Sequence, residues 1–168
     1  MNKELELMRF IYENLRAPWL DNTMIFFSEI AELAMVWYLA GMVLLCLKKY
    51  RKHGIALIIS VSIAFLCGEF IIKNIICRVR PCFLVEGIKL IYNIPKSYSF
   101  PSGHASTSFT AAMVLLKTNK KSGIFAFIVA TLIGISRVYL FVHFPTDVLA
   151  GVILGILIAQ ITTRIFSV

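Results

Sequence analysis

The amino-acid sequence predicts an all-α, multispan membrane helical bundle. We expect about five transmembrane helices plus an N-terminal interfacial amphipathic helix, in one domain of 168 residues. Charged residues make up 15% of the chain and hydrophobic residues 59%, whereas soluble domains carry about 25% charged and 45–50% apolar residues. The apolar residues also gather in runs that approach the roughly 20 residues needed to cross a bilayer.

The apolar runs define five predicted spans. They are residues 24–47, 55–77, 103–118, 122–140 and 146–165. The third is short, so we expect it to start from a loop held inside the protein. In residues 3–20 apolar side chains recur at helical spacing between charged ones, which is typical of a helix lying in the membrane interface. A signal peptide is the alternative, but the early acidic residues argue against it.

Basic residues gather in the short gaps between the spans. "KKYRKHG" (48–54) follows the first span, "KTNKKSG" (117–123) follows the third, and Arg164 ends the fifth. With an odd number of spans these sites share one side, which the positive-inside rule makes cytoplasmic. The 78–102 loop and the 141–146 turn are then expected on the other side.

The net charge of +8 does not indicate a nucleic-acid partner, because the basic residues lie between apolar runs and not on one polar face. The four cysteines lack metal-ligand spacing, and pairing of Cys77 with Cys82 stays open. Because no cluster of acidic residues of the kind that holds Mg²⁺ is evident, we expect no metal and no other cofactor.

Ionisable residues inside apolar runs are costly in a membrane and indicate functional sites. Lys73 and Arg80 are seven positions apart, so they share a face if the helix continues to Pro81. Glu69 precedes Lys73 by four positions, the favourable order for a helical ion pair. It either holds the lysine in place or only makes its burial tolerable. Arg78 is interpreted as an interfacial anchor.

The stretch "SFPSGHAS" (99–106) predicts a helix start that binds phosphate. The first turn of a helix has backbone N–H groups without helical partners, and these bind anions. Ser102 adds a hydroxyl donor, and Gly103 lets a ligand approach the backbone. An ordinary helix cap is the alternative, and the adjacent His104 favours a functional site.

The stretch "SRVYLFVHFPTD" (136–147) places Asp147 four residues after His143. The carboxylate can accept a hydrogen bond from one ring nitrogen and leave the other nitrogen to attack. Taken singly, a structural histidine and a capping aspartate are the alternatives. Together, the cations, the helix start and the two histidines indicate a site for phosphoryl transfer, where one histidine attacks and the other protonates the leaving oxygen.

Three stretches, "KNIICRVRP" (73–81), "PSGH" (101–104) and "SRVYLFVHFPTD" (136–147), resemble the signature of the type 2 phosphatidic acid phosphatase family, which is related to the vanadium haloperoxidases. The resemblance implies that His143 is the nucleophile and forms a phosphohistidine, that Asp147 orients it, and that His104 is the general acid. It implies that the phosphate is held by Lys73, Arg80, Ser102, Gly103 and Arg137. Ser136 belongs to the signature, with local hydrogen bonding as its expected role. The family needs no metal.

The leading functional hypothesis is an integral membrane lipid phosphatase acting on a lipid (di)phosphate. Undecaprenyl diphosphate is the first choice of substrate, and phosphatidylglycerophosphate and phosphatidic acid are alternatives. A small lipid or ion transporter is the alternative of another class, disfavoured because the charges gather at one face without a repeat. The expected partners are the lipid substrate and the bilayer, a homo-oligomer stays open, and the expected location is the bacterial cytoplasmic membrane with the site on its non-cytoplasmic side.

Overall fold

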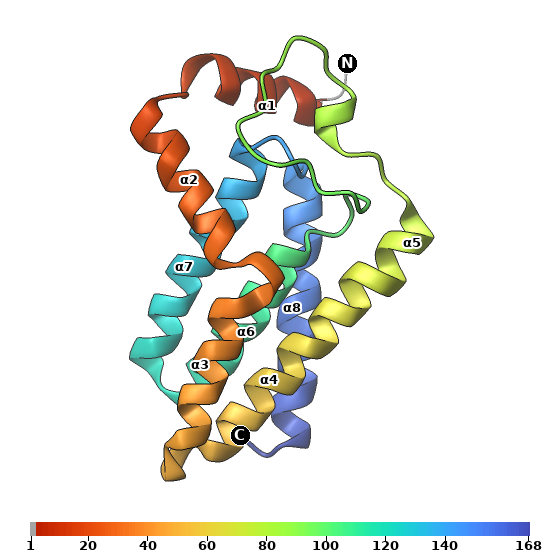
Figure 1. The fold of residues 1–168 in the computed structure, drawn as a ribbon. Coiled ribbons are helices and arrows are strands. Elements are labelled where there is room, and N and C mark those ends of the chain that lie inside the picture. The colour runs from red at the N-terminus through yellow and green to blue at the C-terminus, as the bar shows by residue number, and fades with distance from the viewer. Residues whose placement is uncertain (1–2) are drawn as a thin grey trace.

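The computed structural model describes residues 3–168, which form a bundle of helices (Figure 1). The α-helices are α1 (Lys3–Asn14), α2 (Pro18–Ile30), α3 (Met35–Cys46), α4 (Arg51–Leu66), α5 (Lys73–Ile76), α6 (Gly103–Thr118), α7 (Lys120–Tyr139) and α8 (Pro145–Ile165). Between them lie the short helices η1 (Glu32–Ala34), η2 (Lys48–Tyr50) and η4 (Pro81–Phe83), and the π-helical segment η3 (Cys67–Ile72). The described residues contain no strand, which confirms the all-α class.

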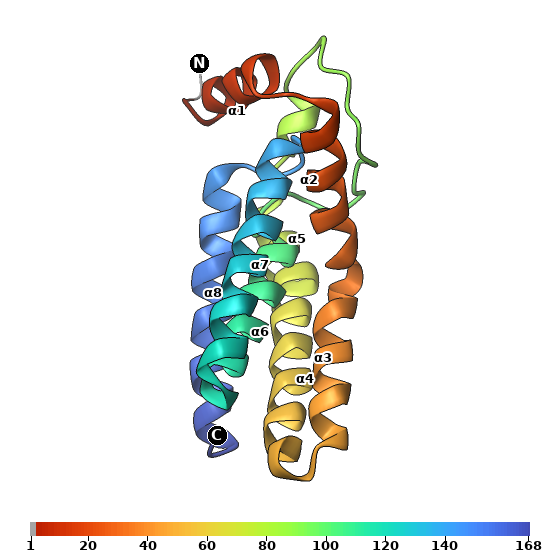
Figure 2. The same ribbon diagram turned by 90° about the vertical axis from the view of Figure 1, so that its left-hand side faces the viewer.

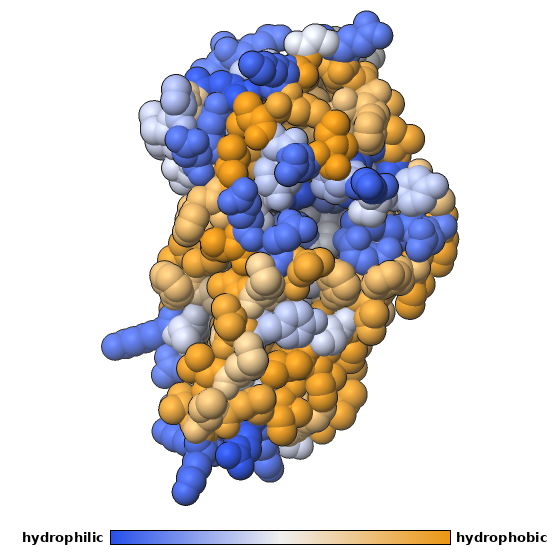
Figure 3. Space-filling model, in the orientation of Figure 1, coloured by the Kyte–Doolittle hydropathy of each residue, from blue (hydrophilic) through white to orange (hydrophobic). Residues whose placement is uncertain are grey.

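The outer surface of the bundle has the character of a membrane protein. Leu149, Ile153, Leu157 and Ile161 recur every four residues along α8, and each is more than half exposed. In residues 3–168, three helical stretches are long and apolar enough to cross a membrane: Lys48–Phe83, Lys120–Tyr139 and Pro145–Ile165. Figure 3 shows apolar side chains over most of the length of one face, with polar atoms at its lower end and around a hollow in its upper half. The prediction of a membrane bundle is confirmed.

The first predicted span, 24–47, is broken and not continuous. The helix pair Pro18–Ile30 and Glu32–Cys46 is bent by 48°, and it counts as a fourth span only if both halves are taken together. At the bend, Leu33 and Ala34 adopt left-handed backbone angles, with φ of 49° and 58°. Such angles are unfavourable for residues with a Cβ atom. Residues 30–35 contain no glycine or proline that would predict the break.

The third predicted span forms α6, which is a buried core helix. It packs against α4, α7 and α8 and buries most of its residues. Its 16 residues give a length of about 24 Å at 1.5 Å per residue, less than the roughly 30 Å of membrane hydrocarbon. In Figure 1 the helix begins below α1 and the 84–102 loop, as expected for a start from an internal loop.

Two glycines allow α8 to approach α6 closely. A Cβ atom on Gly151 would lie 2.6 Å from the carbonyl oxygen of Ser102, and one on Gly155 would lie 2.3 Å from that of Ser106. Glycines four residues apart are a common device for close packing of membrane helices. This contact fixes the start of α6 against α8.

The N-terminal helix α1 lies across one end of the bundle (Figures 1 and 2). It is shorter than the predicted segment 3–20, because the chain leaves the helix after Asn14 and begins α2 at Pro18. Met8 is buried against Phe141 and Phe144, whereas Leu7 and Phe10 on the other side are exposed. The helix thus has one face on the protein and another available to lipid.

The two ends of the bundle carry different segments of the chain. Figure 1 shows α1, the 84–102 loop and the turn between α7 and α8 at one end, and the α3–α4 turn and the C-terminus at the other. The lysine-rich gaps therefore lie opposite the loops that carry the signature residues. Which end faces the cytoplasm stays a prediction.

Candidate active site

A pocket with a volume of about 290 Å³ lies against the 84–102 loop, which contributes Tyr92, Ile94 and Ser97 to its lining. Its lining includes most of the side chains that the sequence singled out, namely Glu69, Lys73, Arg80, Gly103, His104, Arg137 and His143. The two histidines thus face one cavity. Ser102, Ser136 and Asp147 do not line it; they lie behind its wall.

Lys73 and Arg80 meet in the pocket, but not on one helical face as predicted. The helix ends at Ile76, Cys77 turns the chain with a φ of 51°, and Arg80 is extended. Lys73 Nζ lies 3.1 Å from Ser97 Oγ, and Arg80 donates to the carbonyl and hydroxyl oxygens of the same serine at 2.7 and 3.1 Å. Ser97 therefore joins the two cations, a role that the sequence did not indicate.

Glu69 and Lys73 form the predicted ion pair, with 2.5 Å between Oε1 and Nζ. Glu69 lies within the π-helical segment η3, and a π-helical turn is a frequent feature of functional sites. The carboxylate rests against Gly103, where a Cβ atom would come within 2.3 Å of Oε1. The absence of a side chain at Gly103 therefore makes room for Glu69. The sequence had suggested another reason for this glycine, the approach of a ligand to the backbone.

Ser102 and Gly103 begin α6 at the wall of the pocket. The hydroxyl of Ser102 accepts a hydrogen bond from the backbone N–H of Ala105 at 3.4 Å, and Ser102 is fully buried. Its side chain therefore acts as an ordinary helix cap here, which was the alternative interpretation. Its binding of phosphate stays a prediction, whereas Gly103 and His104 place the helix start directly at the cavity.

His143 is buried in the turn between α7 and α8. Its Nε2 atom lies 3.1 Å from Nη1 of Arg80. An arginine nitrogen can only donate, so we assign Nε2 as the acceptor and place the ring proton on Nδ1. Burial, followed by the nearby charges of Arg80 and Arg137, holds the pKa of His143 well below its usual value. The ring is therefore neutral at physiological pH.

Asp147 lies next to His143 but does not form the predicted hydrogen bond with it, because 3.6 Å separates its Oδ2 from Nδ1. Its carboxylate accepts hydrogen bonds from Ser99 Oγ at 2.5 Å, the backbone N–H of Phe144 at 2.9 Å and Arg78 at 2.5 Å. These bonds hold the buried carboxylate in place beside the ring. In this structure the carboxylate therefore lies beside the ring of His143 without a hydrogen bond to it.

Arg78 has a larger role than the interfacial anchor that the sequence suggested. Besides Asp147, its guanidinium binds Glu4 of α1 at 2.8 Å. Glu4 also accepts from the backbone and side chain of Thr146. Burial alone would raise the pKa of Glu4, but these bonds outweigh it and lower the pKa. The surface helix is thereby tied to the carboxylate behind His143.

Arg137 is almost completely buried and reaches the pocket from α7. It donates to the hydroxyl of Ser28, and its guanidinium lies 5.1 Å from the centre of the Tyr92 ring. Ser136, its neighbour, donates to the carbonyl oxygen of Ile133 at 2.7 Å. This local bond is the role that the sequence predicted for Ser136.

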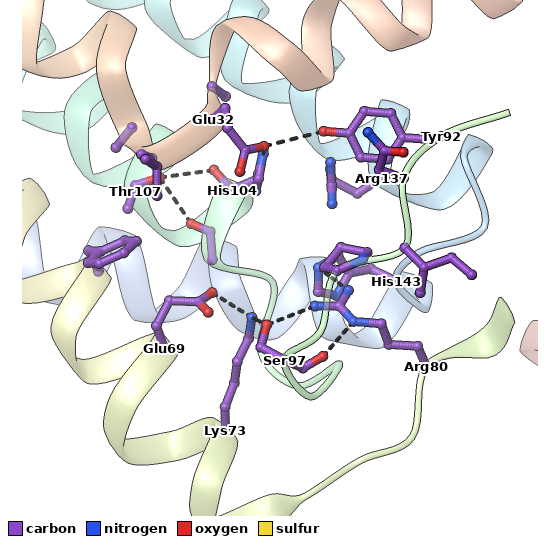
Figure 4. Close-up of a pocket in the computed structure, with 18 residues that line it drawn as sticks. Glu32, Glu69, Lys73, Arg80, Tyr92, Ser97, His104, Thr107, Arg137 and His143 are labelled. Atoms are coloured by element: carbon purple, nitrogen blue, oxygen red, sulfur yellow. Dashed lines mark hydrogen bonds and ion pairs between the residues drawn. The ribbon is translucent and has the colours of Figure 1, made fainter. Parts of the chain in front are cut away.

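His104 faces Glu32 at the break between α2 and α3. Their Nε2 and Oε2 atoms are 3.6 Å apart, and Tyr92 donates to the same carboxylate oxygen at 3.3 Å. Figure 4 shows Glu32, His104 and Tyr92 on one side of the pocket and Lys73, Arg80 and Ser97 on another. Glu32 was not among the predicted site residues, although an acidic residue inside the apolar run 24–47 is a signal of a functional site.

Comparison with known proteins identifies the family. The profile of the PAP2 superfamily matches residues 53–168. The chain belongs to the PAP2 superfamily. It is 39% identical to a protein of Sulfolobus acidocaldarius named undecaprenyl-diphosphatase, over 97% of this chain and 78% of that protein.

Solved structures extend the likeness of this PAP2 protein to the fold. A transmembrane PAP2-type phosphatidylglycerolphosphate phosphatase from Bacillus subtilis is 28% identical with a TM-score of 0.77, over 98% of this chain and 85% of that chain. LpxE of Aquifex aeolicus is 30% identical with a TM-score of 0.75, over 98% and 96% of the two chains. This PAP2 protein is thus similar in fold to two proteins of known structure, and the first of these is named a transmembrane phosphatase.

The pocket of this PAP2 protein has the parts needed for phosphoryl transfer. Lys73, Arg80 and Arg137 line the pocket and can supply positive charge to an anion, because donors held in advance stabilise charge that develops during a reaction. A neutral imidazole with an acceptor nitrogen is the form that attacks phosphorus. The second histidine, His104, lies on another side of the same cavity.

Proposed function

We propose that this protein hydrolyses the terminal phosphate of a lipid (di)phosphate through a phosphohistidine on Nε2 of His143. The observation that carries the proposal is the buried ring of His143, whose Nε2 lies 3.1 Å from Nη1 of Arg80 in a cavity that three cations and a second histidine share. The apolar surface of the bundle supports a membrane lipid as the substrate.

In the proposed mechanism, Lys73, Arg80 and Arg137 hold the oxygens of the terminal phosphate. The lone pair of His143 Nε2 forms a bond to phosphorus while the bond to the leaving oxygen breaks, and His104 gives that oxygen a proton. Water then attacks the phosphohistidine and returns a proton to His104. Asp147 stabilises the positive charge that develops on the ring of His143.

Undecaprenyl diphosphate is our first choice of substrate. It is supported by the name of the Sulfolobus acidocaldarius relative, and the Bacillus subtilis structure supports phosphatidylglycerophosphate as the alternative. Leu33, Phe65 and Ile94 add apolar surface to the polar pocket. We propose that the first part of the lipid tail lies against these side chains.

We propose that the reaction needs no metal. Among the described residues, no group of three or more His, Cys, Asp or Glu side chains is arranged to hold a metal ion. The positive charge that a metal would supply comes from the three basic side chains. Phosphate release that survives an excess of chelator is the expected result, and its loss would contradict metal independence.

We also propose that the pocket faces the non-cytoplasmic side of the bacterial cytoplasmic membrane, as the positive-inside rule predicts. In a cysteine-free background, Lys89→Cys should react with an impermeant thiol reagent on intact cells, and Lys120→Cys only after permeabilisation. The reverse pattern would place the pocket on the cytoplasmic side.

The proposed function is tested by phosphate release from a panel of lipid phosphates with the purified protein. His143→Ala and His104→Ala should each abolish turnover, whereas His53→Ala, the third histidine of the chain, should not. Trapping of an acid-labile phosphoprotein in the wild type and its absence from His143→Ala would support the intermediate. Turnover that persists in both pocket variants would refute the mechanism.

A further inference from the structure

Glu32 is placed over the pocket by a strained break in a membrane helix. The bend of 48° between α2 and α3 puts η1 at the cavity, and two consecutive non-glycine residues, Leu33 and Ala34, take left-handed angles there. Such strain persists only where the surroundings hold it, and it clusters at functional sites. A continuous helix would carry the acidic side chain elsewhere.

The carboxylate of Glu32 meets a buried nitrogen that has no other partner. Nε2 of His104 forms no hydrogen bond within residues 3–168, and Glu32 Oε2 is 3.6 Å away from it. Tyr92 donates its hydroxyl to the same oxygen and holds the carboxylate from the loop side (Figure 4). The contact is therefore an ion pair whenever the ring is protonated.

His104 needs such a partner because its surroundings oppose a positive charge. Arg137 from α7, Lys73 from α5, Arg80 and Tyr92 from the segments between α5 and α6, and His143 from the α7–α8 turn share the pocket with it. Among the acidic groups, Glu69 from η3 also faces the pocket, but it is bound to Lys73 at 2.5 Å. Glu32 accepts a hydrogen bond from the neutral hydroxyl of Tyr92 instead. Its negative charge is therefore available to the His104 ring. A buried imidazole among cations loses its proton readily, yet a general acid must carry one.

We propose that Glu32 is a positioning residue: its carboxylate, 3.6 Å from Nε2, keeps the His104 ring protonated at the pocket until the leaving oxygen takes that proton. This inference deepens the proposed function and rests on it. When the bond between phosphorus and the leaving oxygen breaks, that oxygen takes the proton of Nε2 and His104 becomes neutral. The water that later attacks the phosphohistidine gives its proton to Nε2, and the ion pair with Glu32 forms again.

The test compares Glu32→Gln with Glu29→Gln. Both variants remove one acidic charge near the same end of the first span, but Glu29 is exposed and lies outside the active-site pocket. In Glu32→Gln, His104 loses its proton at lower pH, so the alkaline limb of the rate profile should move down by about one pH unit. Turnover at pH 7.5 should fall about tenfold and recover as the pH is lowered. Glu32→Asp should keep most of the wild-type profile, and Glu29→Gln all of it.

A second measurement needs no substrate. In protein with labelled histidines, the NMR signal of His104 should titrate at lower pH in Glu32→Gln than in the wild type, and at an unchanged pH in Glu29→Gln. An alkaline limb and a His104 titration that both stay unchanged in Glu32→Gln would overturn the role of Glu32. A wild type that releases no phosphate from any lipid would refute the proposed function instead, and the NMR titration would still decide whether the ion pair exists.

Discussion

Arg80 points its Nη1 at Nε2 of His143, the proposed nucleophile, across 3.1 Å, so the lone pair of this nitrogen faces a cation. A nitrogen that accepts a hydrogen bond from arginine cannot attack phosphorus at the same time. When a phosphate binds, its oxygens offer the guanidinium a stronger, charged acceptor. Arg80 therefore orients the ring through this hydrogen bond, and we expect it to release Nε2 when it binds a phosphate.

Arg80→Lys tests this double role. The guanidinium donates to carbonyl oxygens of Ser97, Tyr98 and Val142 as well as to the ring, and a lysine cannot reproduce this planar set of donors. We expect kcat/KM to fall about 100-fold, the scale for loss of one donor to a transition state. Arg164→Lys, an exposed position at the other end of the bundle, is the control. A loss of less than twofold in Arg80→Lys would contradict the argument.

The protonation of His143 gives a prediction with a definite sign. Burial and neighbouring cations lower its pKa well below 6.5, so the ring stays neutral and nucleophilic as the pH falls through 6.5 and becomes charged only at lower pH. NMR of labelled histidine measures this directly, because the chain has three histidines and three single substitutions assign them. Titration of His143 at or above pH 6.5 would disagree with the cationic surroundings.

The sequence predicted which residues form the site better than it predicted the course of the backbone that brings them together. The spacing in "KNIICRVRP" suggested one helical face, but the left-handed turn at Cys77 ends the helix, and Ser97 joins the two cations instead. Apolar periodicity cannot reveal such a turn, because it depends on contacts with a distant loop. For the same reason the break at Glu32 and the Arg78–Asp147 pair were missed.

Gly103→Ala should weaken catalysis without unfolding the protein. The added Cβ atom would lie 2.3 Å from Oε1 of Glu69, so the carboxylate must move and its 2.5 Å bond to Lys73 is disturbed. Small displacements of a group that holds the substrate can cost up to about 100-fold in rate; we expect at least tenfold. Gly68→Ala is a matched control, because its Cβ atom would meet Ser106 Oγ at an ordinary 3.7 Å.

Glu69→Gln removes the negative charge from the Glu69–Lys73 contact and keeps nearly the same side-chain shape. We expect weaker catalysis with intact folding, because the amide no longer fixes the lysine by charge. Phosphate release and thermal melting, measured on the same preparation, check both parts. Unchanged rates would leave Glu69 with only a structural role, which is the alternative that the sequence left open.

Arg78→Gln should affect both stability and activity. Asp147 is completely buried, and its 2.5 Å bond to Arg78 supplies the positive charge that compensates it. Removing one member of a buried ion pair costs about 3–5 kcal/mol, and partial exposure of Arg78 places our expectation at the lower end, about 3 kcal/mol. Glu4→Gln leaves the Arg78–Asp147 bond in place and should cost less. Equal melting temperatures for the two variants would show that Arg78 acts mainly through α1.

Gly155→Ala tests whether the close contact of α8 with α6 supports the site. A Cβ atom on Gly155 would lie 2.3 Å from the carbonyl oxygen of Ser106 and 3.0 Å from the backbone nitrogen of Thr110. Backbone atoms cannot rotate away as a side chain can, so the two helices must separate, and overpacking of this kind costs about 1–3 kcal/mol. Since α6 carries His104 in its first turn, turnover should fall together with the melting temperature. Gly134→Ala is the control, because its nearest contact is the side chain of Val148 at 3.1 Å. If Gly155→Ala melts and turns over like Gly134→Ala, the helix contact does not position the histidine.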